Sequence, residues 1–186
     1  MTDHISINPL LFLDVDGTLL PRGGGPVLTT EQDWVAWQHE SNPELARIDR
    51  AHGPRLLAIQ CDLMWATAWR HDANKVIAPL LGLPQLPVVD LPEWEGDYHQ
   101  DGLSWKTRAL VARAAGRPFA WLDDELTQAD RAWVAAHHSG PALLHRVDSG
   151  TGMLHDDMSA VEAWFASLAV GETAADETAA DASNAA

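Results

Sequence analysis

The chain has 186 residues, of which 46% are hydrophobic, so it can bury a sizeable core and is about one domain long. Its 27 acidic residues outnumber 12 basic ones, and the formal net charge of -15 argues against a broad, sequence-independent grip on nucleic acid or on an anionic membrane. The single cysteine, Cys61, excludes an internal disulfide and a cysteine-based zinc site. We expect a reduced thiol in a cytoplasmic protein, because the N-terminus lacks the basic region of a signal peptide and no segment is long enough to cross a membrane.

The strongest pattern is the stretch 10–19, with the sequence LLFLDVDGTL. Its apolar first part is typical of a buried parallel strand, and the strand is followed at once by two carboxylates, Asp14 and Asp16, a turn glycine and a hydroxyl. Ligands of open α/β sheets bind beyond the carboxyl ends of the strands, so a site is expected here. The alternative is an ordinary edge turn with a capping aspartate.

The segment 18–52 follows, without an obvious strand. A turn-rich loop over residues 21–26 is followed by a predicted helix over residues 30–40, with Trp34 and Trp37 on one face. Together the loop and the helix could form a flap over the site. The two tryptophans either pack this flap onto the core or stack on a substrate.

Four further apolar runs predict strands at residues 62–66, 86–90, 118–122 and 142–147. Helices are predicted between or after them, at residues 53–59, at 73–81 with Asp72 as the N-cap, from Ser104 as a cap to 115, from about 130 to 138, and at 158–168. This alternation predicts an α/β fold, with a five-stranded parallel sheet covered on both faces by right-handed crossovers. Residues 170–186 are rich in Ala, Asp, Glu and Thr, and we expect them to be a disordered acidic tail.

A second set of carboxylates follows the strand at 118–122. Asp123, Asp124 and Glu125 repeat the arrangement of Asp14 and Asp16, and carboxylate oxygens are the ligands that a hard cation such as Mg²⁺ prefers. The sequence therefore predicts a magnesium site at one edge of the sheet.

Four other polar residues are candidates for the same site. Thr67 ends the second predicted strand, and Arg70 and His71 lie on the following loop, where they either reach the same ligand or are simply solvated. Lys106 is one of only two lysines in the chain, and a compact ammonium suits the neutralisation of a phosphoryl group. Taken alone, Lys106 would equally suit a solvent-facing position at the start of a helix.

These positions, in this order, resemble the four motifs of the haloacid dehalogenase (HAD) superfamily of phosphohydrolases. Asp14-Val15-Asp16-Gly17-Thr18 resembles motif I, Thr67 motif II, Lys106 motif III and Asp123-Asp124 the double-aspartate form of motif IV. The resemblance covers about residues 9–168 and implies a Rossmannoid three-layer sandwich with strand order 5-4-1-2-3. The spacing between motifs leaves room for the flap but not for a large cap domain, so we expect one catalytic domain over residues 1–169.

The resemblance also implies a mechanism. Asp14 would be the nucleophile that forms an aspartyl-phosphate, and Asp16 the general acid and base. Thr67 and Lys106 would hold the phosphoryl oxygens, while Asp14, the main-chain carbonyl of Asp16, and Asp123 would hold Mg²⁺ with help from Asp124. Because an acid is present at position 16, the chain resembles the superfamily's phosphatases or phosphomutases more than its dehalogenases or ion-pumping ATPases.

The substrate stays open at this point. The residues around Trp65-Ala66-Thr67-Ala68-Trp69 are similar to small capless bacterial HAD proteins related to the HAD domains of RNA-repair proteins, which suggests a polynucleotide end phosphatase. Such an enzyme normally binds the phosphate backbone of nucleic acid through clustered Lys and Arg side chains. The negative net charge of this chain therefore favours a small-molecule phosphate monoester as the substrate. A third alternative is a catalytically silent binding module of the same fold, which would be expected to have lost part of the catalytic set. The sequence predicts neither a membrane partner nor an oligomeric state.

Overall fold

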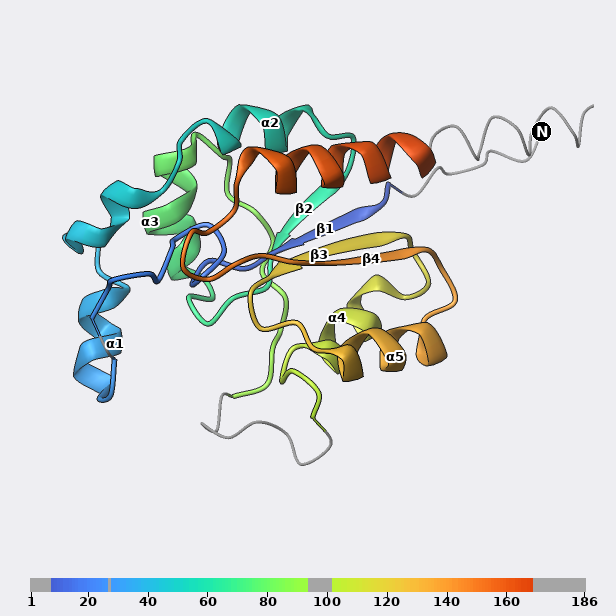
Figure 1. The fold of residues 1–186 in the computed structure, drawn as a ribbon, viewed down its shortest axis with the longest axis horizontal. Helices are drawn as coiled ribbons and strands as arrows, with labels where there is room; N and C mark the ends of the chain where they lie inside the picture. The colour runs from blue at the N-terminus through green and yellow to red at the C-terminus, as the bar shows by residue number, and fades with distance from the viewer. Residues whose placement is uncertain (1–7, 27, 94–101, 169–186) are drawn as a thin grey trace, which may run out of the picture.

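The computed structural model describes residues 8–26, 28–93 and 102–168 (Figure 1). Four parallel strands form its sheet in the order β2-β1-β3-β4. They are β1 (Leu10–Leu13), β2 (Asp62–Trp65), β3 (Phe119–Asp123) and β4 (Ala142–Arg146). The expectation of a parallel α/β sheet with the first strand inside it is confirmed.

The register of β1 with its two neighbours, β2 and β3, places the carboxyl ends of these three strands side by side. Leu13, the last residue of β1, lies opposite Trp65 on β2 and opposite Leu122 on β3. The next residue along each strand therefore arrives at the same edge of the sheet. This puts Asp14 beside Asp123, and Thr67 follows two residues after the end of β2.

The predicted fifth strand at residues 86–90 is wrong. Only one parallel bridge, between Trp65 and Val88, continues the sheet beyond β2 in the described part of the chain. It is made by two bonds, from the Trp65 N–H to the Pro87 carbonyl and from the Val89 N–H to the Trp65 carbonyl, each 2.9 Å long. Pro84 and Pro87 have no N–H to donate, so a longer ladder is not supported on this edge.

The helices cover both faces of the sheet, which gives the three layers that are visible in Figure 1. They are α1 (Glu31–Trp37), the 3-10 helix η1 (Pro43–Arg47), α2 (His52–Ala58), α3 (Asp72–Leu81), α4 (Thr107–Ala114), α5 (Gln128–His137) and a final helix over residues 155–168. The core on one face joins α2, α3 and the final helix to the sheet, and the core on the other face joins α4 and α5 to it. Among the described residues, no helix combines the length and the apolar character that crossing a membrane requires.

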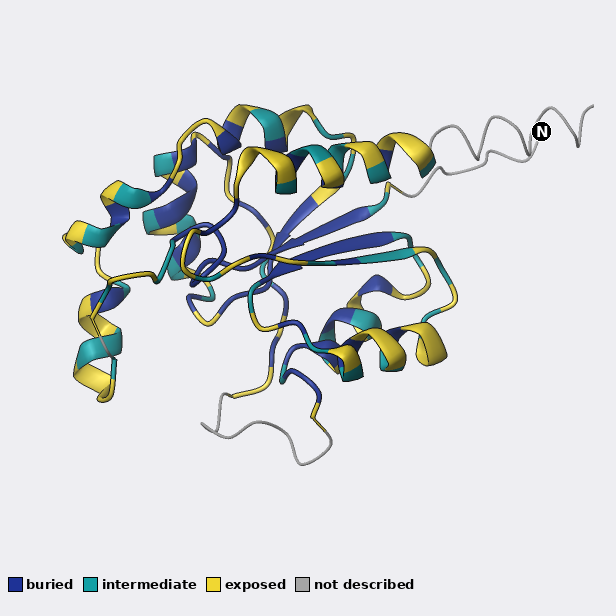
Figure 2. Cartoon of the chain, in the orientation of Figure 1, coloured by how far each residue is buried: buried dark blue, intermediate teal, exposed yellow. Residues whose placement is uncertain are grey.

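Alternation along the strands divides the side chains between these two cores. Leu11 and Leu13 of β1 face one core and Leu10 and Phe12 face the other, and all four side chains are fully buried. Figure 2 shows the strands mostly in dark blue and the outer faces of the helices in yellow. A strand buried on both faces is continuously apolar, which is why the sequence LLFL could be recognised as a central strand.

Two helix starts differ from the sequence-based expectation. Asp72 is the first residue of α3 and not its cap, and His71, which precedes it, makes no side-chain cap bond. Ser104 lies before a turn that ends at Lys106, so that α4 begins only at Thr107. The main-chain N–H of Lys106 donates to the Ser104 hydroxyl at 3.3 Å, so Ser104 caps this turn instead of the helix.

The segment 18–52 contains α1 and η1, and buried side chains that include Trp37, Leu45 and Ile48 anchor it to the core. Thr30 and Asp33 form a reciprocal capping box at the start of α1. Trp37 is buried in the core, which agrees with the alternative in which this tryptophan packs the flap onto the core. The expected tail at 170–186 lies outside the described residues.

Candidate active site

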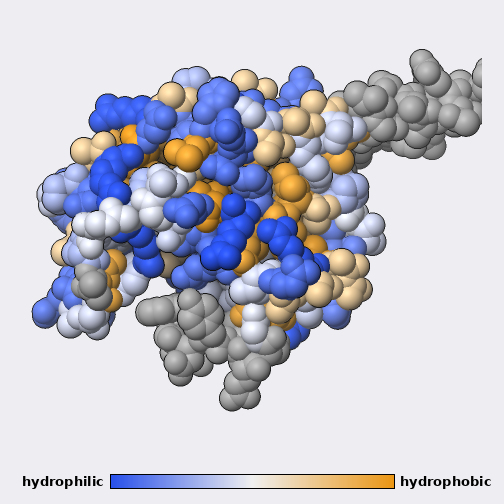
Figure 3. Space-filling model, viewed as in Figure 1, coloured by the Kyte–Doolittle hydropathy of each residue, from blue (hydrophilic) through white to orange (hydrophobic). Residues whose placement is uncertain are grey.

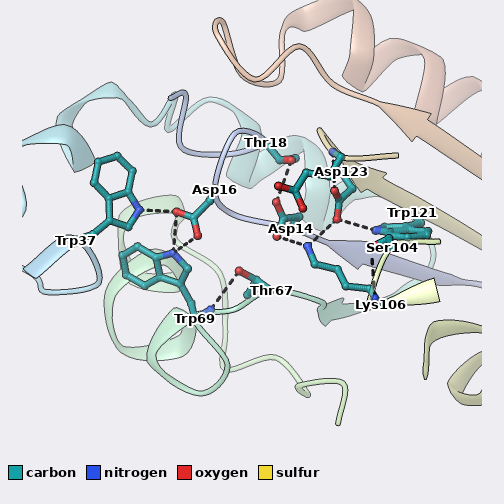
Figure 4. A network of polar contacts seen from close by, with 11 residues as sticks. Asp14, Asp16, Thr18, Trp37, Thr67, Trp69, Ser104, Lys106, Trp121 and Asp123 are labelled. Atoms are coloured by element: carbon teal, nitrogen blue, oxygen red, sulfur yellow. Dashed lines mark hydrogen bonds and ion pairs between the residues drawn. The ribbon is translucent and has the colours of Figure 1, made fainter. Parts of the chain in front are cut away.

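The side chains of Asp14, Lys106 and Asp123 meet at the carboxyl edge of the sheet (Figure 4). The Lys106 ammonium lies 2.7 Å from Oδ1 of Asp14 and 2.7 Å from Oδ2 of Asp123. The three side chains are almost completely buried, with 5% or less of each exposed. One ammonium thus bridges two carboxylates that come from neighbouring strands.

The carboxylates of Asp14 and Asp123 accept further hydrogen bonds besides those from Lys106. The Thr18 hydroxyl donates to Oδ2 of Asp14 at 3.3 Å, and the Trp121 indole donates to Oδ2 of Asp123 at 3.1 Å. The main-chain N–H of Glu125 donates to Oδ1 of Asp123 at 2.9 Å. These bonds hold both carboxylates in place before any ligand arrives.

Asp124 completes a group of carboxylates that could hold a metal ion. One oxygen each from Asp14, Asp123 and Asp124 lies within 4.8 Å of the others. Asp124 comes close to the turn after β1 because Gly17, with φ of +76°, has no side chain, and a Cβ there would overlap the Asp124 carboxylate. The glycine therefore makes room for the third carboxylate.

Burial and mutual repulsion change the pKa values in this cluster. Burial raises the pKa of the Asp14 carboxyl well above its usual range, the Lys106 ammonium opposes this effect, and the neighbouring carboxylates add to it. The pKa of Asp124 is raised to about 7 by burial and by the charges of Asp123 and Glu125. Burial opposes the charged form of Lys106, but Asp123 and Asp14 outweigh it and keep the ammonium protonated by raising its pKa.

Asp16 is held on the other side of Asp14, away from the ammonium (Figure 4). The Trp37 indole N–H donates to its Oδ1 at 2.5 Å, and the Trp69 indole N–H lies 3.1 Å from Oδ1 and 3.0 Å from Oδ2. The Asp16 side chain is not a member of the carboxylate group that could hold a metal. Its expected metal contact is through the main-chain carbonyl and stays a prediction.

Thr67 is fully buried, and its hydroxyl accepts a bond from the main-chain N–H of Trp69 at 3.3 Å. Its predicted contact with a phosphoryl oxygen is not tested by these contacts. Arg70 lies on the wall of the cavity described below, where its guanidinium donates to the carbonyls of Leu91 and Pro92 at 3.0 and 2.8 Å. His71 is exposed and does not line that cavity.

A buried carboxylate from another helix fixes the loop that carries Lys106. Asp130, in the first turn of α5, is fully buried and accepts bonds from the main-chain N–H of Ser104 at 2.8 Å and from the Thr107 hydroxyl. Its other oxygen closes the capping box with Thr127. Asp130 thus ties the residues on both sides of Lys106 to the start of α5.

A cavity of about 680 Å³ opens beside Asp14, Asp16 and Lys106. Its wall includes aromatic, cationic and acidic side chains, among them Arg22, Trp34, Arg70, Asp90, Trp105 and Glu125. The face of the molecule drawn in Figure 3 is mainly hydrophilic, with apolar groups in small patches between polar ones. The volume is in the range typical of sites for small molecules.

Sequence reasoning missed the contacts of Trp37, Trp69, Trp121 and Asp130. Trp121 could have been found, because it lies two residues before Asp123 on the same strand and must therefore point to the same face. The other three reach the site from elements that are distant in the chain, and no local pattern shows which way their side chains point.

No protein-family model matches this chain, and no curated protein matches it. Two solved structures are similar to it, both of the HAD domain of the effector protein Lem4 from Legionella pneumophila. The first is 15% identical, with a TM-score of 0.47 over 77% of this chain and 88% of that chain. The second, an inactive mutant, is 14% identical, with a TM-score of 0.49 over 77% of this chain and 87% of that chain.

Proposed function

We propose that this chain is a Mg²⁺-dependent phosphohydrolase that acts on a phosphate monoester through an aspartyl-phosphate. The observation that carries the proposal is the placement of the Asp14 carboxylate on the wall of a cavity, close to a buried ammonium and two further carboxylates. A nucleophile, a cation for the phosphoryl oxygens and a set of oxygen ligands are what phosphoryl transfer needs in one place.

The donor set fits a divalent metal ion. Asp14, Asp123 and Asp124 supply three carboxylates, against which Lys106 supplies one positive charge, so the cluster carries a formal excess of two negative charges. A hard divalent cation would balance this excess, and all three donors are oxygens. When bound, the cation would supply a positive charge that reduces the repulsion between Asp14 and the phosphate.

The chain's own residues then carry the following roles. A carboxylate oxygen of Asp14 attacks phosphorus while the bond from phosphorus to the leaving oxygen breaks, and Asp16 gives its proton to that oxygen. Water then attacks the aspartyl-phosphate, Asp16 takes a proton from it, and the bond from phosphorus to Asp14 breaks to release inorganic phosphate. Lys106 and Thr67 would hold the phosphoryl oxygens during both steps.

For the substrate we propose a small-molecule phosphate monoester. The cavity volume of about 680 Å³ suits a small molecule. Asp90, Glu93 and Glu125 lie on its wall together with Arg22 and Arg70, so a polyanionic nucleic-acid backbone would meet repulsion there as well as attraction. These local charges point in the same direction as the net charge of the whole chain.

The experiment is phosphate release from a panel of sugar phosphates, nucleotides and oligonucleotides with a 5′- or 3′-phosphate, measured with Mg²⁺ and with EDTA. We expect turnover of small esters that EDTA and Asp14→Asn both abolish, while Asp156→Asn, at a fully exposed position on the final helix, changes nothing. Turnover that survives Asp14→Asn would contradict the mechanism. Reaction of oligonucleotides alone would favour the polynucleotide end phosphatase, and no turnover together with no Mg²⁺ binding would contradict the proposal and favour the binding module.

A further inference from the structure

The carboxylate of Asp16 is clamped by two indole groups from separate parts of the chain. Trp37 is the last residue of α1, and Trp69 lies on the loop that follows β2. Together their N–H groups engage both oxygens of Asp16, whose exposed fraction is 8%. A carboxylate with donors on both oxygens has a fixed orientation, because rotation about its side-chain bonds would break these bonds.

We propose that Trp37 and Trp69 are positioning residues for Asp16, so that the docked α1 segment places the group that protonates the leaving oxygen. The inference rests on the proposed function, in which Asp16 is the acid and base. It goes beyond that function because it gives the segment 18–52 a part in the chemistry, through a contact that the motifs do not contain.

The position of α1 supports this role. Trp34, on the same helix, and Gln38, directly after it, line the cavity that Asp14 and Asp16 also line. The helix that would face the leaving group of a bound ester is therefore the helix that holds the acid. Figure 4 shows both indole nitrogens pointing at Asp16, on the side away from Lys106.

The competing explanation is that Trp37 and Trp69 only pack the core, since both belong to the same apolar cluster. In that case any aromatic ring of similar size would serve, and loss of the N–H would matter only for stability. Substitution by Phe separates the two explanations, because it retains a buried ring and removes the donor.

The experiment compares two phosphate esters with Trp37→Phe, Trp69→Phe and the unaltered chain. 4-Nitrophenyl phosphate has a good leaving group that needs little protonation, whereas benzyl phosphate has a poor one that depends on an acid. General acid catalysis contributes about 10²–10⁴-fold, so a misplaced acid should lower kcat/KM for benzyl phosphate about tenfold or more beyond any loss with 4-nitrophenyl phosphate. Asp16→Asn should show the same selective loss in a stronger form.

Trp65→Phe is the matched control. Trp65 is also fully buried, and its indole donates to Oδ1 of Asn74 at 2.9 Å, away from Asp16. This variant should lose stability and should change kcat/KM for both esters by the same factor. Equal losses for the two esters in Trp37→Phe and Trp69→Phe would overturn the positioning role and leave the proposed function intact.

A measurement without turnover tests the contacts themselves. The chain has nine tryptophans, so its ¹⁵N–¹H spectrum should contain nine indole signals, and the Phe variants identify those of Trp37 and Trp69. In Asp16→Asn these two signals should move the most. If they do not move, the clamp is absent in solution and the inference is wrong. Absence of any turnover by the unaltered chain would instead overturn the proposed function, and this role with it.

Discussion

The Lys106 ammonium and the Asp14 carboxylate form an ion pair of 2.7 Å in which each side chain is 5% exposed. The same ammonium also pairs with Asp123, so one lysine neutralises carboxylates from two adjacent strands. A buried charge is stable only when it is paired with an opposite charge. Removal of Lys106 or of its carboxylate partners would therefore leave an uncompensated charge in the protein interior.

Removal of Lys106 should therefore destabilise the protein as well as inactivate it. In EDTA we expect Lys106→Met to lower the free energy of unfolding by about 3–5 kcal/mol, since it leaves the carboxylates of Asp14 and Asp123 without their cation. Urea denaturation measures this change. Lys75→Met is the matched control, because Lys75 is the chain's other lysine and its pair with Asp72 is solvent-exposed. An equal loss in the two variants would contradict the account of Lys106.

Gly17 should be needed for metal binding because it makes room for Asp124. Gly17→Ala adds a Cβ that overlaps the Asp124 carboxylate and strains a residue at φ of +76°. Gly24→Ala imposes similar strain at φ of +73° but meets nothing within 4 Å. Both variants should lose about 1 kcal/mol of stability through the backbone, but only Gly17→Ala should weaken Mg²⁺ binding in calorimetry. Unchanged binding in Gly17→Ala would contradict the account that the glycine makes room for Asp124 at the metal site.

The stability of the metal-free protein should fall as the pH rises from about 4 to 7. The pKa of Asp124 is raised from 3.8 to about 7, so between these values the folded state retains a proton that the unfolded state has lost. Stability falls with pH wherever the folded state binds more protons, and the contribution levels off above pH 7.

Thermal unfolding in EDTA between pH 4.5 and 8 measures this slope. Asp124→Asn should make the slope shallower, because an amide does not titrate, whereas Asp156→Asn, which removes a fully exposed carboxyl, should leave the slope as it is. Added Mg²⁺ should stabilise the protein more at pH 8 than at pH 5, since protons compete with the cation for the same oxygens. A slope that is the same with and without the Asp124 carboxyl would be evidence against the raised pKa.

Asp130 should support Lys106 without touching the substrate. Both oxygens of Asp130 accept hydrogen bonds from N–H or O–H groups, and Asp130→Asn replaces one of these oxygens with an NH₂ donor. We expect the free energy of unfolding to fall by about 1–3 kcal/mol. It should also lower kcat, because Ser104 and Thr107 on either side of Lys106 lose their anchor.

Asp33→Asn provides the comparison for this variant. Asp33 has the same place in the capping box of α1 but lies nearer the surface. It should cost less stability and lower kcat less than Asp130→Asn does, because it does not touch the loop that carries Lys106. If the two variants reduce kcat alike, the effect belongs to capping in general and not to the anchoring of the Lys106 loop.

The sequence by itself determined the central strand and the acids that follow it. A run such as LLFL can be continuously apolar only where both faces of a strand are buried, and carboxylates directly after it must lie at the edge of the sheet. The same local reasoning placed Asp123 and Asp124. The prediction of a strand at residues 86–90 was wrong because it rested on the apolar pattern alone. The prolines in and before this segment cannot donate the hydrogen bonds of a longer ladder, and the segment pairs with β2 through a single bridge.

Only the tertiary structure decided what these acids contact. The pairing of one ammonium with Asp14 and Asp123, the approach of Asp124 to Gly17, and the two indoles on Asp16 all join residues from different elements. Periodicity states which face of its own element a side chain occupies, but the direction of a loop residue such as Trp69 depends on how the elements pack. For this reason the positions of the candidate nucleophile and metal ligands could be read from the sequence, whereas the clamp on Asp16 could not.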